Sequence, residues 1–112
     1  MLDFERLDVY KCAIEHLSLV FGWIPKLKRG SSAVADQWRR AAMSVPLNIG
    51  EATGKMNGAE RSHSYRIARG EAMECGANLD VVRLMRVIPD AEIDRGKLLL
   101  VRVVGMLSKL AK

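Results

Sequence analysis

The stretch from Trp38 to Gly54 constrains the fold of this chain more than any other. Apolar residues recur in and just before it at spacings of three and four, which places them on one face of a helix. They are Val34, Trp38, Ala41, Val45, Ile49 and Ala52. Pro46 interrupts the pattern, and a proline inside a helix removes a backbone hydrogen bond at a cost of about 3 kcal/mol. We therefore predict a helix with a kink near residue 46, compensated by packing against its neighbours.

Three further segments show the same kind of periodicity, and short breaks separate them. Helices are expected at about residues 8–24, from Ser31 or Ser32 to near Gly54, at 58–87, and from 91 to near the end of the chain. Asn57, followed three residues later by Glu60, is close to a capping box at the start of the third helix. Short loops between amphipathic helices favour antiparallel neighbours. The sequence thus predicts an all-α, antiparallel up-down-up-down four-helix bundle, with residues 1–112 forming one domain.

The composition agrees with a helical protein and restricts its location. Aromatic residues make up only 5% of the 112 residues, whereas strands are rich in aromatic and β-branched side chains. The longest apolar stretch, Leu17 to Ile24, is far shorter than the roughly 20 residues that cross a bilayer. Early acidic residues argue against a secretory signal. We expect a cytoplasmic protein without a membrane role, in which Cys12 and Cys75 are free thiols in the core.

The last two helices carry features that suggest contact with another helix. The third contains small residues, among them Gly70 and Gly76, which would allow close approach of a neighbour. The fourth is apolar on two sides. One stripe is enough for an internal core, so the second is a candidate oligomer interface, although a wide internal face explains it equally well. The candidate interface residues are Leu99, Val103, Met106 and Leu110.

Basic residues are concentrated in three blocks, at 26–40, 55–70 and 95–112, in a chain of net charge +5. Such blocks create local positive potential that attracts nucleic acid or an acidic partner, although a soluble surface with a basic bias is the simpler interpretation. The candidate nucleic-acid-binding residues are Lys28, Arg29, Lys55, Arg61, Arg66, Arg95, Lys97 and Arg102. No aromatic stacking platform lies among them, so binding would depend on the phosphate backbone.

Signatures of catalysis are absent from the sequence. His16 and His63 lie far apart, without cysteine or carboxylate partners at ligand spacing, so we expect no metal. Neither a Gly-x-Ser-x-Gly elbow nor a phosphate-binding glycine loop is present. Glu71 and Glu74 lie one turn apart, but a solvated or ion-paired face is the favoured interpretation. We expect a non-enzymatic protein without a cofactor.

Three segments, 7–11, 39–51 and 67–74, together resemble a bacterial family of four-helix bundles. The family is named for proteins encoded in intervening sequences of large-subunit ribosomal RNA genes, and the accessory variability protein of diversity-generating retroelements looks like a relative. The matching positions are Arg40, Pro46, Asn48, Ile49, Glu51, Arg69, Gly70 and Glu74, whereas Leu47, Gly50 and Glu71 depart from the family pattern. The resemblance implies a small cytoplasmic bundle, often a ring-like homo-oligomer with a pentamer as first choice, and an RNA or DNA partner.

One group of polar residues stands out among these positions. It consists of Arg40, Asn48, Glu51, Arg69 and Glu74. We interpret it as a structural polar network between helices, with a recognition pocket for an acidic group or a phosphate as the alternative. For the whole protein we expect an oligomeric nucleic-acid-binding accessory protein. The alternative is a structural scaffold that binds a protein partner and has no nucleic-acid role.

Overall fold

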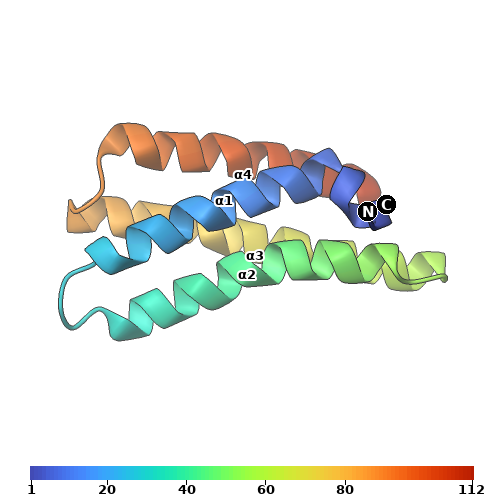
Figure 1. Ribbon diagram of the computed structural model, residues 1–112, viewed down its shortest axis with the longest axis horizontal. Coiled ribbons are helices and arrows are strands. Elements are labelled where there is room, and N and C mark those ends of the chain that lie inside the picture. The colour runs from blue at the N-terminus through green and yellow to red at the C-terminus, as the bar shows by residue number, and fades with distance from the viewer.

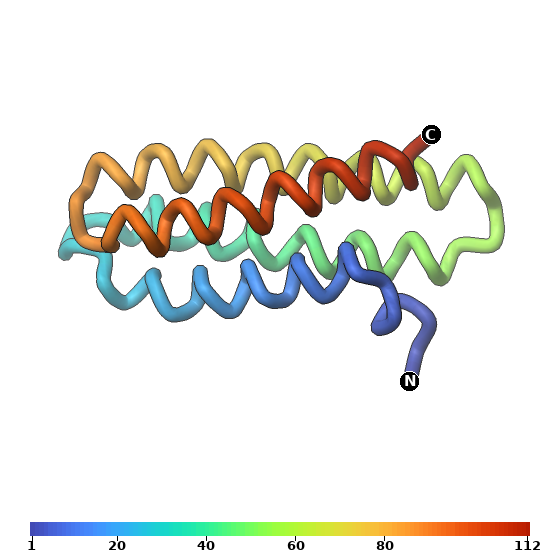
Figure 2. Tube along the Cα trace, turned by 90° about the horizontal axis from the view of Figure 1, so that it is seen from above, coloured from blue at the N-terminus to red at the C-terminus, as the bar shows by residue number.

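Four long helices account for most of the computed structural model, which describes all of residues 1–112 and contains no strand. They are α1 (Asp8–Trp23), α2 (Ser32–Thr53), α3 (Gly58–Met85) and α4 (Asp90–Leu110), with short 3-10 turns η1 (Asp3–Arg6) and η2 (Ile24–Lys26) on either side of α1. Successive helices run in opposite directions, so both termini lie at the same end of an elongated bundle (Figure 1, Figure 2). The predicted all-α four-helix bundle is confirmed.

The ends of the helices follow local signals in the sequence. The side chain of Asn57 accepts hydrogen bonds from the backbone N–H groups of Ala59 and Glu60 at 2.8 and 3.2 Å, which confirms it as the cap of α3. Pro25 occupies the first turn of η2, where α1 has ended. At the end of α3, Arg86 adopts a left-handed conformation with φ of 56°, which stops the helix.

Helix α2 continues through Pro46 without a break, and its two halves run in slightly different directions in Figure 1. Proline bends this helix instead of ending it because Pro46 is buried among packed neighbours. The side chain of Asn48 adds two bonds beside it, donating to the Ser44 carbonyl at 2.9 Å and to the Ser44 hydroxyl at 2.8 Å. Packing and this local bonding together offset the backbone bond that proline removes.

The core runs between all four helices as one cluster of 23 buried apolar residues. The rings of Trp23 and Trp38 stack within it, with centroids 5.9 Å apart, and the Trp23 indole donates to Glu92 on α4 at 3.2 Å. Cys12 and Cys75 are buried and free, as expected. None of the four helices combines the length and hydropathy of a membrane span.

The predicted oligomer stripe on α4 is wrong for its first two residues. Leu99 and Val103 belong to the buried core, Met106 is half-buried, and Leu110 has 38% of its surface exposed. The reason is the position of α4, which packs against α1 on one side and α3 on the other. A helix with two packed neighbours needs two apolar stripes, so the wide internal face was the correct alternative.

The glycines within α3 do not serve close packing within the chain either. A Cβ atom added at Gly70 or Gly76, or at Gly105 on α4, would meet no atom within 4 Å. Gly96 on α4 is the contrasting case, because a Cβ there would lie 2.9 Å from the Trp23 ring. The close approach within the bundle therefore occurs at Gly96, and the other three glycines border open space.

Candidate nucleic-acid interface

Ion pairs divide the basic side chains into neutralised and free groups. Three of the predicted nucleic-acid-binding residues are neutralised: Lys55 by Glu51 at 3.5 Å, Arg95 by Glu15 at 3.1 Å and Lys97 by Asp80 at 2.7 Å. These cations already have a carboxylate at contact distance, so they contribute less to attracting a phosphate.

The remaining predicted cations do not form a single surface. Lys28 and Arg29 lie in the loop between α1 and α2, and Arg61 and Arg66 lie in the first part of α3, at the opposite end of the bundle (Figure 1). The molecule extends 44 Å along this axis. Sequence blocks that look alike in charge are thus separated by nearly the full length of the protein.

Five cations lie where the start of α3 meets the end of α4, and we call this group the basic end. Its members are Arg61, Arg66, Arg69, Lys109 and Lys112. No carboxylate lies within 4.0 Å of any of these five side chains. Arg102 also has no ion-pair partner, but it lies near the middle of α4, outside this group. Sequence reasoning had not assigned Arg69, Lys109 and Lys112 to nucleic-acid binding. The signal was available in the sequence, since Lys109 and Lys112 lie three residues apart at the end of α4.

Hydrogen bonds to the end of α4 hold two of these arginines. Arg66 donates from Nη1 to the Ala111 carbonyl at 3.2 Å. Arg69 donates from Nε to the Ser108 hydroxyl at 2.8 Å, and that hydroxyl donates to the Val104 carbonyl at 2.8 Å. Cations are favourable at this position because the last carbonyls of a helix carry partial negative charge.

Arg61 is held at the neighbouring turn. Its Nη1 donates to the carbonyls of Lys55 and Met56, at 3.0 and 3.1 Å. The side chains of Arg61 and Lys112 line an open cavity of about 520 Å³, which also borders Tyr65. Burial raises the pKa of Tyr65, and the Arg61 charge partly opposes that shift. The cavity therefore has cationic walls and a neutral phenol.

The predicted network of five polar residues does not form. Asn48 bonds to Ser44 on its own helix, Glu51 pairs with Lys55, and Arg69 bonds to Ser108. Asn48 and Glu51 have partners one turn away on their own helix, where side chains meet easily. Arg69 has its partner on α4, and Arg40 and Glu74 have no ion-pair partner in the chain. No hydrogen bond or ion pair therefore joins any two of the five residues.

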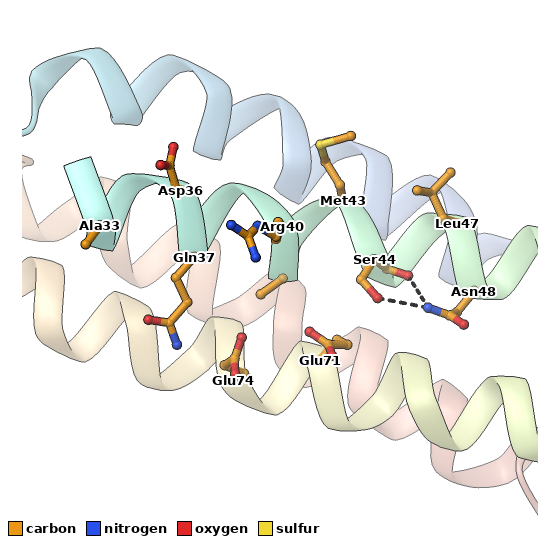
Figure 3. Close-up of a pocket in the computed structure, with 11 residues that line it drawn as sticks. Ala33, Asp36, Gln37, Arg40, Met43, Ser44, Leu47, Asn48, Glu71 and Glu74 are labelled. Atoms are coloured by element: carbon orange, nitrogen blue, oxygen red, sulfur yellow. Dashed lines mark hydrogen bonds between the residues drawn. The ribbon is translucent and has the colours of Figure 1, made fainter. Parts of the chain in front are cut away.

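Arg40 and Glu74 do share a groove between α2 and α3, drawn in Figure 3. It has a volume of about 830 Å³, and its walls also include Glu71. Burial and the neighbouring charge of Glu74 both raise the pKa of Glu71. Carboxylates outnumber the single arginine in this lining, so the groove does not suit a phosphate or another acidic group, and the alternative hypothesis for these residues is not supported.

The sequence matches the family model of the 23S rRNA-intervening sequence protein over residues 5–109. The chain belongs to this family. No individual curated protein matches the sequence. The family assignment confirms the resemblance drawn from segments 7–11, 39–51 and 67–74, while the relation to the retroelement accessory protein stays a prediction.

The family positions of this intervening-sequence protein divide between its core and its surface. Pro46 and Ile49 are buried in the core, and Asn48 bonds beside the proline. The other five positions are exposed, and Arg69 among them lies at the basic end. No group of histidine, cysteine and acidic side chains is arranged to hold a metal ion.

An apolar surface covers the outer side of α3 and α4. Met73 is 55% exposed, Leu84 82%, and Leu98 and Val101 68% each. A shallow groove of about 490 Å³ lies between the two helices, lined by Met73 and Val101 together with Gly76, Ala77 and Gly105. We call Met73, Leu84, Leu98 and Val101 the outer apolar face. Sequence periodicity missed it, because inward-facing and outward-facing apolar residues alternate on the same helices.

Proposed function

We propose that this intervening-sequence family member is a non-enzymatic accessory protein that binds the phosphate backbone of RNA or DNA through its basic end. The observation that carries the proposal is the presence of five cations at one end of the bundle with no carboxylate at contact distance. Such a surface creates a positive potential over a defined area and releases counterions when phosphates bind. A cytoplasmic location, expected from the sequence, is part of this proposal.

Binding at this surface would depend on the charge and shape of the nucleic acid more than on its base sequence. Tyr65 borders the basic end and is 7% exposed. Phe4 and Tyr10, near the N-terminus at the same end of the bundle, are half-buried and pack against each other. Bases therefore find no fully exposed aromatic ring there on which to stack. We expect affinity to fall steeply and log-linearly with salt, with a slope set by the number of phosphates contacted.

Self-association through the outer apolar face is the second part of the proposal. Contiguous exposed apolar surface of this kind usually marks an interface. Ile14 and Phe21 on α1 and Leu47 on α2 are also exposed, on the pair of helices opposite α3 and α4. Two different apolar faces on opposite sides favour head-to-tail contacts that close into a ring. Five copies remain the first choice, from the family resemblance, and a ring would repeat the basic end and raise its avidity.

Fluorescence anisotropy with labelled RNA and DNA, from about 50 to 200 mM salt, tests nucleic-acid binding. The informative variant is Arg66→Glu with Arg69→Glu. Its matched control is Lys28→Glu with Arg29→Glu, which makes the same change in net charge at the opposite end. We expect the first pair to abolish binding and the second to leave most of it, with both folds intact by circular dichroism. No binding at low salt, or equal losses from the two pairs, would contradict the proposal.

Light scattering tests self-association and separates the two functions. We expect a mass well above the 12.5 kDa of one chain, and a decrease toward that mass for Leu98→Glu with Val101→Glu. A monomer at every concentration would rule out self-association and leave the outer apolar face to another protein. Combined with no nucleic-acid binding, that result would favour the scaffold alternative.

A further inference from the structure

We propose that the basic end selects double-stranded over single-stranded nucleic acid, and that Ser108 is the positioning residue for this selectivity. The inference rests on the proposed function, since it assumes phosphate binding at that surface. It starts from the hydrogen bonds that fix Arg61, Arg66 and Arg69 before any ligand arrives. An arginine that is already ordered presents its remaining N–H groups in a fixed direction.

Arg69 is the clearest case of this arrangement. Its Nε donates to Ser108 at 2.8 Å, and neither Nη group has a partner in the chain. These two groups form the planar fork that binds a phosphate with two parallel hydrogen bonds. Ser108 is itself held by its bond to the Val104 carbonyl, so the position of the fork is set by the backbone of α4. Ser108 thus acts through Arg69 and carries no charge of its own.

The arginines of the basic end are ordered by these bonds, whereas its two lysines are not. Arg66 and Arg69 lie three residues apart on α3, and their side chains reach Ala111 and Ser108 of α4. Lys109 lines a cavity with residues 7–9 at the start of α1, so the ordered array consists of arginines alone. A pre-ordered array of this kind complements phosphates whose spacing is itself fixed, as in a duplex. A flexible single strand must be ordered before it can match the array.

At this surface, stacking of bases on aromatic rings cannot compensate for the cost of ordering a single strand. Proteins that bind single strands combine a positive groove with aromatic side chains that stack on successive bases. Phe21 is the only aromatic residue classed as exposed, and it lies on α1, which contributes no residue to the basic end. The surface therefore provides ordered cations that can bind the phosphates of a duplex, but no exposed aromatic ring on which unpaired bases could stack.

Anisotropy titrations of the protein test the inference. The probes are an RNA duplex of about 20 base pairs, close to two helical turns, and an oligouridylate of the same length. We expect the duplex to bind about tenfold tighter. Ser108→Ala should weaken duplex binding about three- to tenfold while leaving oligouridylate affinity and the salt slope unchanged, because it removes no charge. Arg69→Lys should behave alike, and combining the two should add little.

Ser18→Ala, at an exposed position on α1, is the matched control and should change neither affinity. Equal or tighter binding of the single strand would overturn the inference and leave the proposed function standing. The same holds if Ser108→Ala weakens binding of both probes equally or of neither. Failure of both probes to bind would overturn the proposed function and this inference together.

Discussion

His16 is the residue whose burial has the clearest energetic consequence. Its side chain is fully buried in the core, and neither ring nitrogen has a hydrogen-bond partner. Burial without a partner disfavours the charged imidazolium and lowers the pKa of His16 from 6.5 to about 4. Below pH 6.5 the unfolded chain takes up a proton at this position that the folded protein excludes. The free energy of unfolding must therefore fall as the pH decreases from 6.5 toward 4.

The pH dependence of His16→Leu tests this effect. We expect wild type to lose up to about 3 kcal/mol of stability between pH 6.5 and 4 from this residue. The leucine variant should lose less over the same range and be the more stable protein at pH 5, as measured by urea unfolding. His63→Gln is the control, because His63 is exposed. Parallel pH profiles for wild type and His16→Leu would contradict the prediction.

Within the helices, the glycines of α3 and α4 show two opposing effects on stability, the low helix propensity of glycine and the close packing that only glycine allows. Glycine within a helix costs about 1 kcal/mol relative to alanine. A Cβ at Gly76 meets no atom within 4 Å, whereas one at Gly96 would lie 2.9 Å from Trp23 and 3.3 Å from Leu79. The same substitution should therefore have opposite effects at the two positions.

We expect Gly76→Ala to stabilise the isolated chain by up to about 1 kcal/mol and Gly96→Ala to destabilise it by about 1–3 kcal/mol. Chemical unfolding at low protein concentration measures both. If Gly76→Ala also lowers the mass seen by light scattering, the glycine serves contact between copies. Stabilisation by Gly96→Ala would show that the Trp23 contact is not close in solution.

The whole molecule is held together by one continuous core, although its fluorescent probes lie at one end. The buried cluster includes residues of all four helices. Trp23, the last residue of α1, and Trp38, in the second turn of α2, by contrast lie close to the loop that joins these two helices. If the basic end unfolded separately, tryptophan fluorescence would not report it, whereas circular dichroism would.

We predict a single cooperative unfolding transition, as is usual for a domain below about 150 residues. The midpoints measured by tryptophan fluorescence and by far-ultraviolet circular dichroism should coincide in urea. Glu92→Gln, which weakens the bond from the Trp23 indole to α4, should shift both midpoints together. Separate midpoints would indicate that the bundle consists of two independently unfolding parts.

The sequence by itself determined the helices and their order. Helix formation is local, so spacings of three and four and the Asn57 cap were sufficient to predict α1 to α4 to within a few residues. The apolar stripe of α2, from Trp38 to Ala52, is buried as its periodicity indicated. The family was also readable, because its motif lies in continuous segments of the chain.

Only the tertiary structure decided which faces and charges are free. Burial depends on how many neighbours a helix has, and α4 has two, which placed Leu99 and Val103 inside. Whether a charged side chain is free or paired depends on partners distant in sequence, as in the pairing of Arg95 with Glu15 across 80 positions. The basic end was assembled in the same way, since Arg69 meets Ser108 only because α3 and α4 are antiparallel. The periodicity of one helix carries no information about these contacts between helices, because they are set by the packing of one helix on another.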